Sequence, residues 1–219
     1  LWGGGSPPED FNLGLLHLIP KKDTGLVSDT RPITITNAYN RLIAAVMVEC
    51  ITPALDRLID KRQKMFIQGR LMTEHVEEIN EDYYEACEEE DELYILFLDT
   101  RKAFDSIHHS YLLSLLSHVG FPTWVLNVIT AMLHQVRVSP VLANDAMLLI
   151  FIRRGVKQGC PLSPLLFVLC YDPLVHALGT IDKNKKLKIY AAADDLAVRS
   201  KKLCWLWPVM KIIDIFSAV

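Results

Sequence analysis

The 219 residues can bury a sizeable core, because 51% of them are hydrophobic and 22% are charged. This composition excludes a chain that is disordered throughout. The net charge of −3 argues at first against a nucleic-acid partner, but ten of the 26 acidic residues lie in segment 76–92, which has no Lys or Arg. The remainder carries 23 basic against 16 acidic residues, a net charge of +7, so a basic surface can exist outside this segment. The acidic segment itself is expected to be a solvated helix face and the loop after it.

The sequence also argues against two further classes of protein, membrane proteins and small secreted domains that a bound zinc ion stabilises. The apolar runs are shorter than the roughly 18 residues of a membrane span, or are interrupted by prolines and an aspartate as in segment 161–178. We therefore expect no contact with a membrane, and we recognise no signal peptide. The five cysteines are scattered and lack the spacing of a zinc site, so we expect free thiols.

The first part of the chain is expected to combine short extended segments with two long helices. Segment 13–20 is an apolar run that ends at a proline, and a loop follows it. Alternation of apolar and polar residues predicts a strand over 32–36. Apolar residues at three-and-four spacing predict a helix over 38–60, bent or restarted at Pro53, and a second helix covers about 73–89.

The second part begins with segment 93–98, a continuous apolar run that predicts a buried strand. A helix from about 107 is expected to stop at Gly120, since glycine favours the left-handed conformation that ends helices. Three further helices are expected, over 123–134, from the prolines near 161 to about 178, and over 204–219. Two pairs of strands are expected as well. The first pair is 135–142 and 146–153, joined by a turn at 143–145, and the second is 187–191 and 196–200.

Two adjacent carboxylates, Asp194 and Asp195, interrupt the small and apolar residues of segment 189–198. Such a pair is either a solvated turn or one half of a metal site. Asp99 ends the apolar segment 93–98 in the same way. If the two strands are neighbours, their carboxylates converge and repel one another unless divalent cations neutralise them. Mg²⁺ prefers such oxygen ligands, and two ions roughly 4 Å apart can clamp the attacking and leaving oxygens of phosphoryl transfer.

Six motifs follow one another along the chain: "LIPKK", "TRPITITNAYNRLIA", "FIQGR", "FLDTRKAFDSI", "RRGVKQGCPLSPLLF" and "YAAADDLAV". From about residue 13 to the last residue, this series resembles the reverse transcriptase domain (RNA-directed DNA polymerase) of non-long-terminal-repeat retrotransposons. The resemblance implies an α+β fold of the right-hand polymerase type, with an antiparallel palm sheet and packed helices. It divides the chain into a flexible lead-in (1–10), fingers (11–92 and 108–160) and a truncated palm (93–107 and 161–219).

The resemblance implies a role for each residue of the two acidic motifs. Asp99 matches the carboxylate that binds both metal ions, and the carbonyl of Thr100 completes the coordination. Asp194 matches the catalytic carboxylate of the late hairpin, and Asp195 matches the more peripheral acid beside it. The implied cofactor is a pair of Mg²⁺ ions, with Mn²⁺ as a substitute.

Other residues match positions that contact the nucleotide or the template. Phe104 matches the residue under the sugar, where a ring clashes with a 2′-hydroxyl and favours deoxynucleotides; taken alone, it predicts core packing. Lys21 and Arg31 match cations that orient the triphosphate, although alone they are ordinary surface cations. The remaining implied contacts are Gln158 and Gly159 with the nucleotide and template base, and Gly69 and Arg70 with the template.

The implied reaction adds deoxynucleotides to the 3′-hydroxyl of a DNA primer on an RNA template, in the nucleus or the cytoplasm. Two departures keep an alternative open, a catalytically inactive retroelement relic that at most binds nucleic acid. Ala192 stands where the family has Tyr or Phe. We expect the nearby Tyr190 to fill part of the space that the missing ring leaves. The chain also ends at Val219, so we expect the thumb and any endonuclease domain to be missing.

Overall fold

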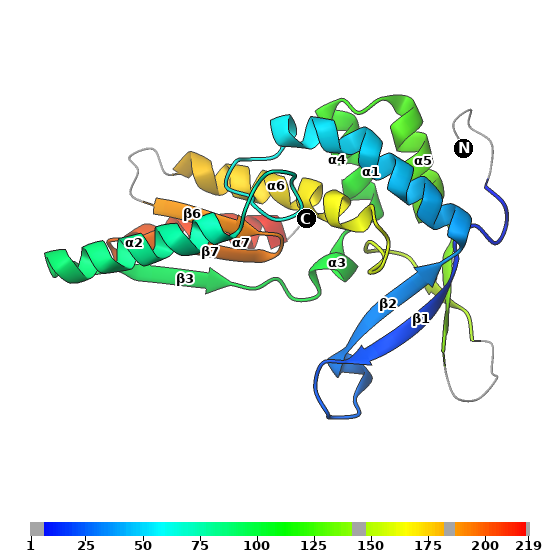
Figure 1. The fold of residues 1–219 in the computed structure, drawn as a ribbon, viewed down its shortest axis with the longest axis horizontal. Helices are drawn as coiled ribbons and strands as arrows, with labels where there is room; N and C mark the ends of the chain where they lie inside the picture. The colour runs from blue at the N-terminus through cyan, green and yellow to red at the C-terminus, as the bar shows by residue number, and fades with distance from the viewer. Residues whose placement is uncertain (1–6, 142–147, 182–186, 218–219) are drawn as a thin grey trace. The chain divides into compact units, whose positions relative to one another are not determined.

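The computed structural model describes residues 7–141, 148–181 and 187–217, so most of the predicted lead-in lies outside it. The chain contains both helices and two sheets whose strands are mostly antiparallel (Figure 1), which confirms the predicted α+β class. The strands are β1 (Leu13–Pro20), β2 (Thr30–Thr36), β3 (Tyr94–Leu98), β4 (Val136–Pro140), β5 (Ile150–Ile152), β6 (Leu187–Ala192) and β7 (Asp195–Ser200). The helices are α1 (Ala38–Leu58), α2 (Thr73–Glu89), α3 (Ala103–Ser106), α4 (His109–Val119), α5 (Thr123–Leu133), α6 (Ser163–Ile181) and α7 (Trp207–Ser217).

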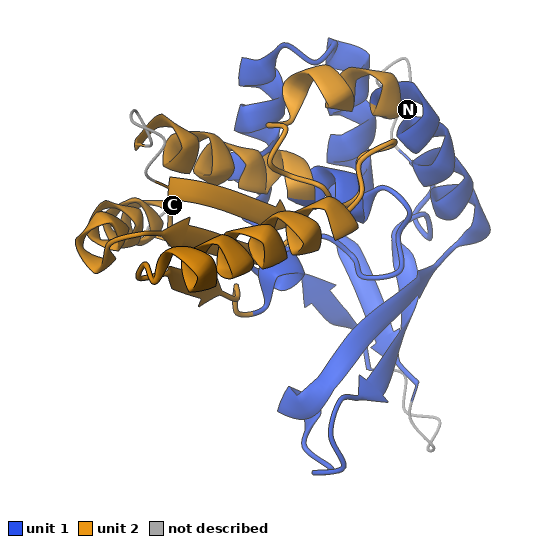
Figure 2. Cartoon of the chain, turned by 60° about the vertical axis from the view of Figure 1, so that its left-hand side comes forward, with its two compact units in different colours: residues 1–51, 102–167 blue, residues 52–101, 168–219 orange. Residues whose placement is uncertain are grey.

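The chain divides into two compact units (Figure 2). The first consists of residues 1–51 and 102–167 and contains a four-stranded sheet, in the order β2-β1-β4-β5. The second consists of residues 52–101 and 168–219 and contains a three-stranded sheet, in the order β3-β7-β6. These boundaries differ from the predicted limits of fingers and palm, and that functional subdivision stays a prediction.

The sheet of the first unit is built around β1. This strand pairs antiparallel with β2 and parallel with β4, and β4 pairs antiparallel with β5. The predicted strand over 32–36 is therefore confirmed, and the apolar run 13–20 is its partner. The predicted pairing of 135–142 with 146–153 is also confirmed, while its expected turn over 143–145 lies outside the described residues.

The helices of the first unit supply much of its core. α4 and α5 follow one another and bury Leu112, Leu116 and Val128 completely. α4 ends where the sequence predicts, because Gly120 adopts a left-handed φ of 91° and its N–H donates to the carbonyl of Leu116. The structure thus confirms both helices that the sequence predicts in this part of the chain.

The sheet of the second unit is a hairpin of β6 and β7 with β3 added along β7. The register pairs Ala192 with Asp195 at the hairpin end, and Leu98 with Leu196 beside it. The predicted hairpin is confirmed. The expectation that 93–98 forms a buried strand is wrong, because no side chain of β3 is buried and that of Phe97 is 71% exposed.

Helix α2 carries most of the acidic segment, but its face is not solvated throughout. Asp82 is only 2% exposed and accepts hydrogen bonds from the Lys188 ammonium (2.7 Å) and the Tyr190 hydroxyl (2.9 Å). The Arg199 guanidinium lies 3.3 Å from the same carboxylate. The prediction of a solvated face is therefore wrong at this position. Tyr190 is engaged by Asp82, and burial together with this carboxylate raises the pKa of its hydroxyl.

Two long helices contain an internal proline. α1 continues as one helix through Pro53, so the predicted restart is absent. α6 continues through Pro173. Within the described residues, α6 is the one helix whose length and composition would suffice for a membrane span, but 56% of that stretch is buried inside the protein. An apolar helix in a protein core has the same properties, so this is weak evidence for a span.

Candidate active site

The acidic pair lies at the turn of the β6–β7 hairpin. Ala193 and Asp194 form the two-residue turn, and Asp195 begins β7. Because Leu98 pairs with Leu196 in antiparallel register, the next residue of that segment, Asp99, emerges at the same end of the sheet as the turn. The structure thus brings two acidic segments together that lie far apart in the sequence.

The carboxylates of these segments influence one another. The pKa of Asp194 is raised, first by burial and then by the negative charges of Asp195 and Asp99. An ionised cluster of this kind is unfavourable by itself, since like charges at short range oppose each other's ionisation. A cation among these acids would relieve the repulsion.

Tyr171 of α6 joins the two acidic segments and was not identified from the sequence. Its hydroxyl lies 3.2 Å from the Thr100 Oγ1 and donates to the main-chain carbonyl of Asp194 at 3.5 Å. Burial raises the pKa of Tyr171, and the charges of the three nearby acids raise it further. A tyrosine within the apolar pattern of a buried helix gives no local sign of such a role, because only the tertiary fold supplies its partners.

The acidic end of this sheet suits a hard divalent cation, although it is not a complete cage. In the described parts of the chain, no three His, Cys, Asp or Glu side chains are grouped closely enough to hold a metal ion by themselves. Mg²⁺ is commonly held by one or two carboxylates, with water and substrate phosphates as its other ligands. Burial raises the pKa of Asp194, and Asp195 and Asp99 lie close enough for their negative charges to raise it further, as expected for carboxylates that could share a cation with water and phosphate ligands.

The loop that contains "FIQGR" folds onto the end of α1. Gly69 adopts a φ of 81°, the left-handed conformation that favours glycine. The side chain of Arg70 is 9% exposed, and its guanidinium pairs with the Asp56 carboxylate at 3.0 Å. It donates to the main-chain carbonyls of Asp60 (2.7 Å), Gln63 (2.9 Å), Asp56 (3.1 Å) and Ile59 (3.1 Å). Arg70 therefore holds this loop together, and its expected contact with a template stays a prediction.

Phe104 of α3 is packed within the first unit. Its ring stacks on that of Phe167, with centroids 4.7 Å apart and planes 14° from parallel. Val156 donates its N–H to the Phe104 carbonyl at 2.8 Å. Gly155 passes so close that an added Cβ would lie 2.8 Å from this carbonyl, so any larger residue there would displace the backbone. Phe104 is thus held firmly, whether or not it contacts a sugar.

The predicted nucleotide-binding loop runs beside β2. The carbonyl of Gln158 accepts the N–H of Thr34 at 2.8 Å, and a Cβ on Gly159 would lie 2.8 Å from the Thr34 carbonyl. Gly159 has a φ of 103°, so both its conformation and the close approach require glycine. In this structure the loop with Gln158 and Gly159 lies against β2, and its expected contact with a nucleotide stays a prediction.

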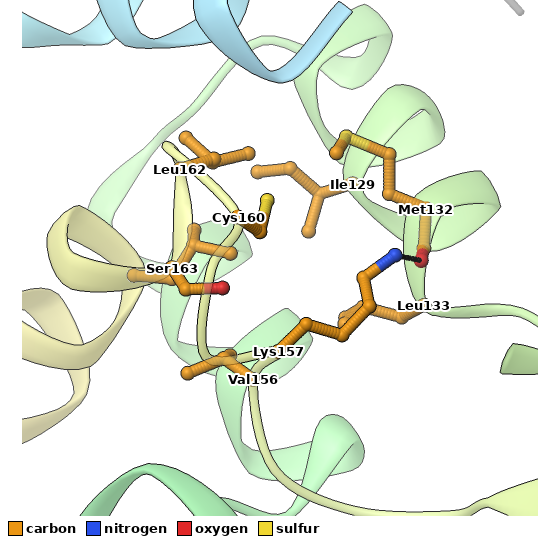
Figure 3. Close-up of a pocket in the computed structure, with 9 residues that line it drawn as sticks. Ile129, Met132, Leu133, Val156, Lys157, Cys160, Leu162 and Ser163 are labelled. Carbon is orange, nitrogen blue, oxygen red and sulfur yellow. Dashed lines mark hydrogen bonds between the residues drawn. The ribbon is translucent and has the colours of Figure 1, made fainter. Parts of the chain in front are cut away.

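Lys157 anchors the same loop in the core (Figure 3). It is only 7% exposed, and its ammonium lies 3.3 Å from the Met132 carbonyl and 3.5 Å from the Asn40 Oδ1. The ammonium borders a small cavity that Cys160 and Ile129 also line. Burial lowers the pKa of Lys157. No local pattern in the motif indicates that Lys157 is buried while Arg153 and Arg154 are exposed.

Lys21 and Arg31 are exposed near the tip of the β1–β2 hairpin. Arg31 pairs across the strands with Ile19, and the N–H of Lys21 donates to the Asp29 carbonyl at 2.8 Å. The hairpin therefore holds two exposed cations at neighbouring strand ends, and their expected contact with a triphosphate stays a prediction.

Comparison with known proteins supports one family. Residues 19–218 match the family described as Reverse transcriptase (RNA-dependent DNA polymerase). The chain is 34% identical over 205 residues to a retrovirus-related Pol polyprotein from type-1 retrotransposable element R2 of Popillia japonica, covering 88% of this chain and 28% of that protein. It is 27% identical over 205 residues to the probable RNA-directed DNA polymerase from transposon BS of Drosophila melanogaster, covering 90% of this chain and 22% of that protein. The chain thus spans less than a third of the length of these relatives.

Solved structures agree at the level of the fold. A telomerase structure from Candida albicans, in complex with a fragment of telomeric RNA, has a TM-score of 0.67 at 14% identity, covering 96% of this chain and 42% of that one. Apo telomerase from Candida tropicalis has a TM-score of 0.68 at 12% identity, covering 96% and 43%. The chain belongs to the reverse transcriptase family and is related to the polymerases of non-long-terminal-repeat retrotransposons.

Proposed function

We propose that this chain is the catalytic part of an RNA-directed DNA polymerase. It would add deoxynucleotides to the 3′-hydroxyl of a DNA primer on an RNA template and release pyrophosphate. The observation that carries the proposal is the meeting of Asp99 and Asp194 at one end of the β3-β7-β6 sheet, with burial and neighbouring charges raising the pKa of Asp194. Family membership supplies the reaction class to which this geometry is suited.

In the proposed reaction, Asp99 and Asp194 would hold two Mg²⁺ ions, and Asp195 and the Thr100 carbonyl would be available as further ligands. When bound, such ions lower the pKa of the attacking hydroxyl and stabilise negative charge on the leaving pyrophosphate. The protein itself holds the side chains of Asp99 and Asp194 in position. The register of β3 with β7 sets where Asp99 emerges, and the Tyr171 hydroxyl links Thr100 to the Asp194 backbone.

The substrate contacts in this proposal come from the family resemblance. Lys21 and Arg31 would contact the triphosphate, which their exposure on the β1–β2 hairpin supports. The nearby loop would contribute Gln158 and Gly159, while the polymerase fingers would be residues 11–92 and 108–160 and the palm 93–107 and 161–219. RNA template and DNA primer are the implied partners.

A catalytically inactive relic is the second candidate, and Ala192 is the observation that favours it. Ala192 pairs with Asp195 at the hairpin end, where the family has an aromatic ring. Tyr190 does not substitute for that ring, because its hydroxyl is bound by the buried Asp82. In this alternative the acidic residues remain while primer or nucleotide contacts are lost.

Primer extension decides between the two candidates. The chain, with an RNA template, a DNA primer and deoxynucleotides, is expected to extend the primer only when Mg²⁺ is present, and chelation should stop it. The Asp194→Asn variant should not extend the primer. Equal incorporation by both proteins would refute the assigned chemistry, whereas no incorporation even by a longer chain that includes the segments present in its relatives would favour the relic.

Phe104→Ala is expected to change both the stability of the protein and its discrimination between deoxynucleotides and ribonucleotides. Loss of the stacked ring should lower the free energy of unfolding by about 2 kcal/mol, since the ring is half-buried rather than fully enclosed. If the ring also lies under the incoming sugar, the ratio of deoxynucleotide to ribonucleotide incorporation should fall about tenfold or more. Urea unfolding and competitive extension measure the two effects. An unchanged incorporation ratio would limit Phe104 to packing.

A further inference from the structure

We propose that Gln63 is the positioning residue for Asp194, acting through the turn of the β6–β7 hairpin. The inference rests on the proposed function, because Asp194 is the carboxylate whose position would matter. Nothing in the motif series singles out Gln63. The hydrogen bonds of its side chain identify Gln63 as the candidate.

The Gln63 carboxamide forms a two-way contact with the backbone of Ala193. Its Oε1 accepts the Ala193 N–H at 2.8 Å, and its Nε2 donates to the Ala193 carbonyl at 3.2 Å. The side chain is fully buried, at 0% exposure. One amide thus satisfies both polar groups of the residue that immediately precedes Asp194.

The main chain around Gln63 is fixed beside β6. The Ala191 N–H donates to the Arg62 carbonyl at 3.2 Å, and the Lys64 N–H donates to the Ala191 carbonyl at 2.9 Å. Gln63 and Ala191 therefore form a parallel bridge next to the hairpin. The Arg70 guanidinium holds the Gln63 carbonyl at 2.9 Å on the other side. These contacts hold the main chain of Gln63 beside the hairpin, and its side-chain Oε1 also accepts the Met65 N–H at 3.1 Å.

The turn needs this support for a specific reason. Ala193 has a φ of 56°, in the left-handed region that hairpin turns of two residues usually reserve for glycine. Ala193 is also 5% exposed, so its N–H and C=O are shielded from water and must find partners in the protein. A carboxamide offers a donor and an acceptor side by side at this length without any change of protonation. Removing it leaves a strained turn with unpaired groups, adjacent to Asp194.

Two variants of Gln63 separate the parts of this contact, and one variant elsewhere on the same hairpin serves as a control. Gln63→Met keeps the length of the side chain but removes both hydrogen bonds to Ala193, together with the one that the Gln63 Oε1 accepts from the Met65 N–H at 3.1 Å. Gln63→Glu keeps the acceptor for the Ala193 N–H and loses the donor. Tyr190→Phe removes one buried hydrogen bond to Asp82 from β6 and leaves the turn untouched. All are made in the full 219-residue chain.

Amide hydrogen exchange and the Mg²⁺ dependence of primer extension are the two measurements. In Gln63→Met we expect faster exchange of the Ala193 amide and a 10- to 100-fold increase in the Mg²⁺ concentration for half-maximal extension, the range typical of residues that orient metal ligands. In Gln63→Glu the Ala193 amide should stay protected. Tyr190→Phe should lower the melting temperature while leaving both readouts at their original values.

The outcomes separate this inference from the proposed function. Unchanged Ala193 exchange in Gln63→Met, or a Mg²⁺ requirement raised no further than in Tyr190→Phe, would overturn the positioning role. If Gln63→Met does not fold, loss of Ala193 protection in Gln63→Glu would overturn it instead. Full extension activity in Asp194→Asn would refute the proposed function, and the exchange result would then still decide whether Gln63 holds the turn.

Discussion

Asp82→Ala is expected to lower the free energy of unfolding by about 3–5 kcal/mol, the cost of removing one partner from a buried ion pair. Asp82 is 2% exposed, and the Arg199 side chain that it pairs with is 8% exposed. Without Asp82, the guanidinium of Arg199 keeps its charge in a buried position, and the Lys188 ammonium and Tyr190 hydroxyl lose their acceptor. The ion cluster joins α2 to β6 and β7, so the loss should reduce the stability of the whole second unit.

Urea unfolding followed by circular dichroism measures this effect. Lys201→Ala is the matched control, because Lys201 pairs with three acids of the same region, Glu85, Glu89 and Asp91, but does so at the surface. Exposed pairs contribute little to stability, so the control should unfold close to the original midpoint. Equal midpoints for the two variants would contradict the idea that burial makes the Asp82 cluster important.

Asp99→Asn is expected to reduce the rate constant of primer extension by about a thousandfold or more. A metal ion that stabilises charge in the transition state contributes several kcal/mol, and about 4 kcal/mol corresponds to three orders of magnitude in rate. Asparagine keeps the size of the side chain but removes the negative charge that would hold the ion. Asp195→Asn should have a smaller effect, since Asp195 matches the more peripheral acid of the pair.

Single-turnover extension at saturating nucleotide separates this loss from weaker substrate binding. Asp214→Asn, at an exposed acid of α7 in the same unit, is the control and should leave the rate unchanged. Circular dichroism verifies that each variant is folded. A reduction for Asp99→Asn no larger than for Asp214→Asn would remove Asp99 from the chemistry.

The sequence predicted those elements whose signals are local. The spacing of apolar residues identified α1, and Gly120 marked the end of α4 because a left-handed residue is needed there. The hairpin around Asp194 followed from two short apolar strands on either side of an acidic turn. The convergence of Asp99 with that turn depended on one assumption, that two apolar strands lie side by side, and the β3–β7 pairing fulfils it.

The features that the sequence did not predict depend on tertiary partners. The apolar run of β3 is typical of a strand whose two faces are covered, yet Phe97 on β3 is exposed. Asp82 was expected in water because its own helix is acidic, whereas its cationic partners come from β6 and β7. The contact between Gln63 and Ala193 joins residues 130 positions apart, and nothing in either local sequence specifies it.

Anomalous X-ray diffraction from crystals of the chain grown with Mn²⁺ tests most directly whether Asp99 and Asp194 share a divalent cation. Manganese takes the same oxygen ligands as magnesium and can be located by its anomalous scattering. We predict a peak coordinated by carboxylate oxygens of both Asp99 and Asp194, and its absence in crystals of Asp194→Asn. Manganese bound only at other acids, or absent from this end of the sheet at saturating concentration, would contradict the proposed polymerase chemistry.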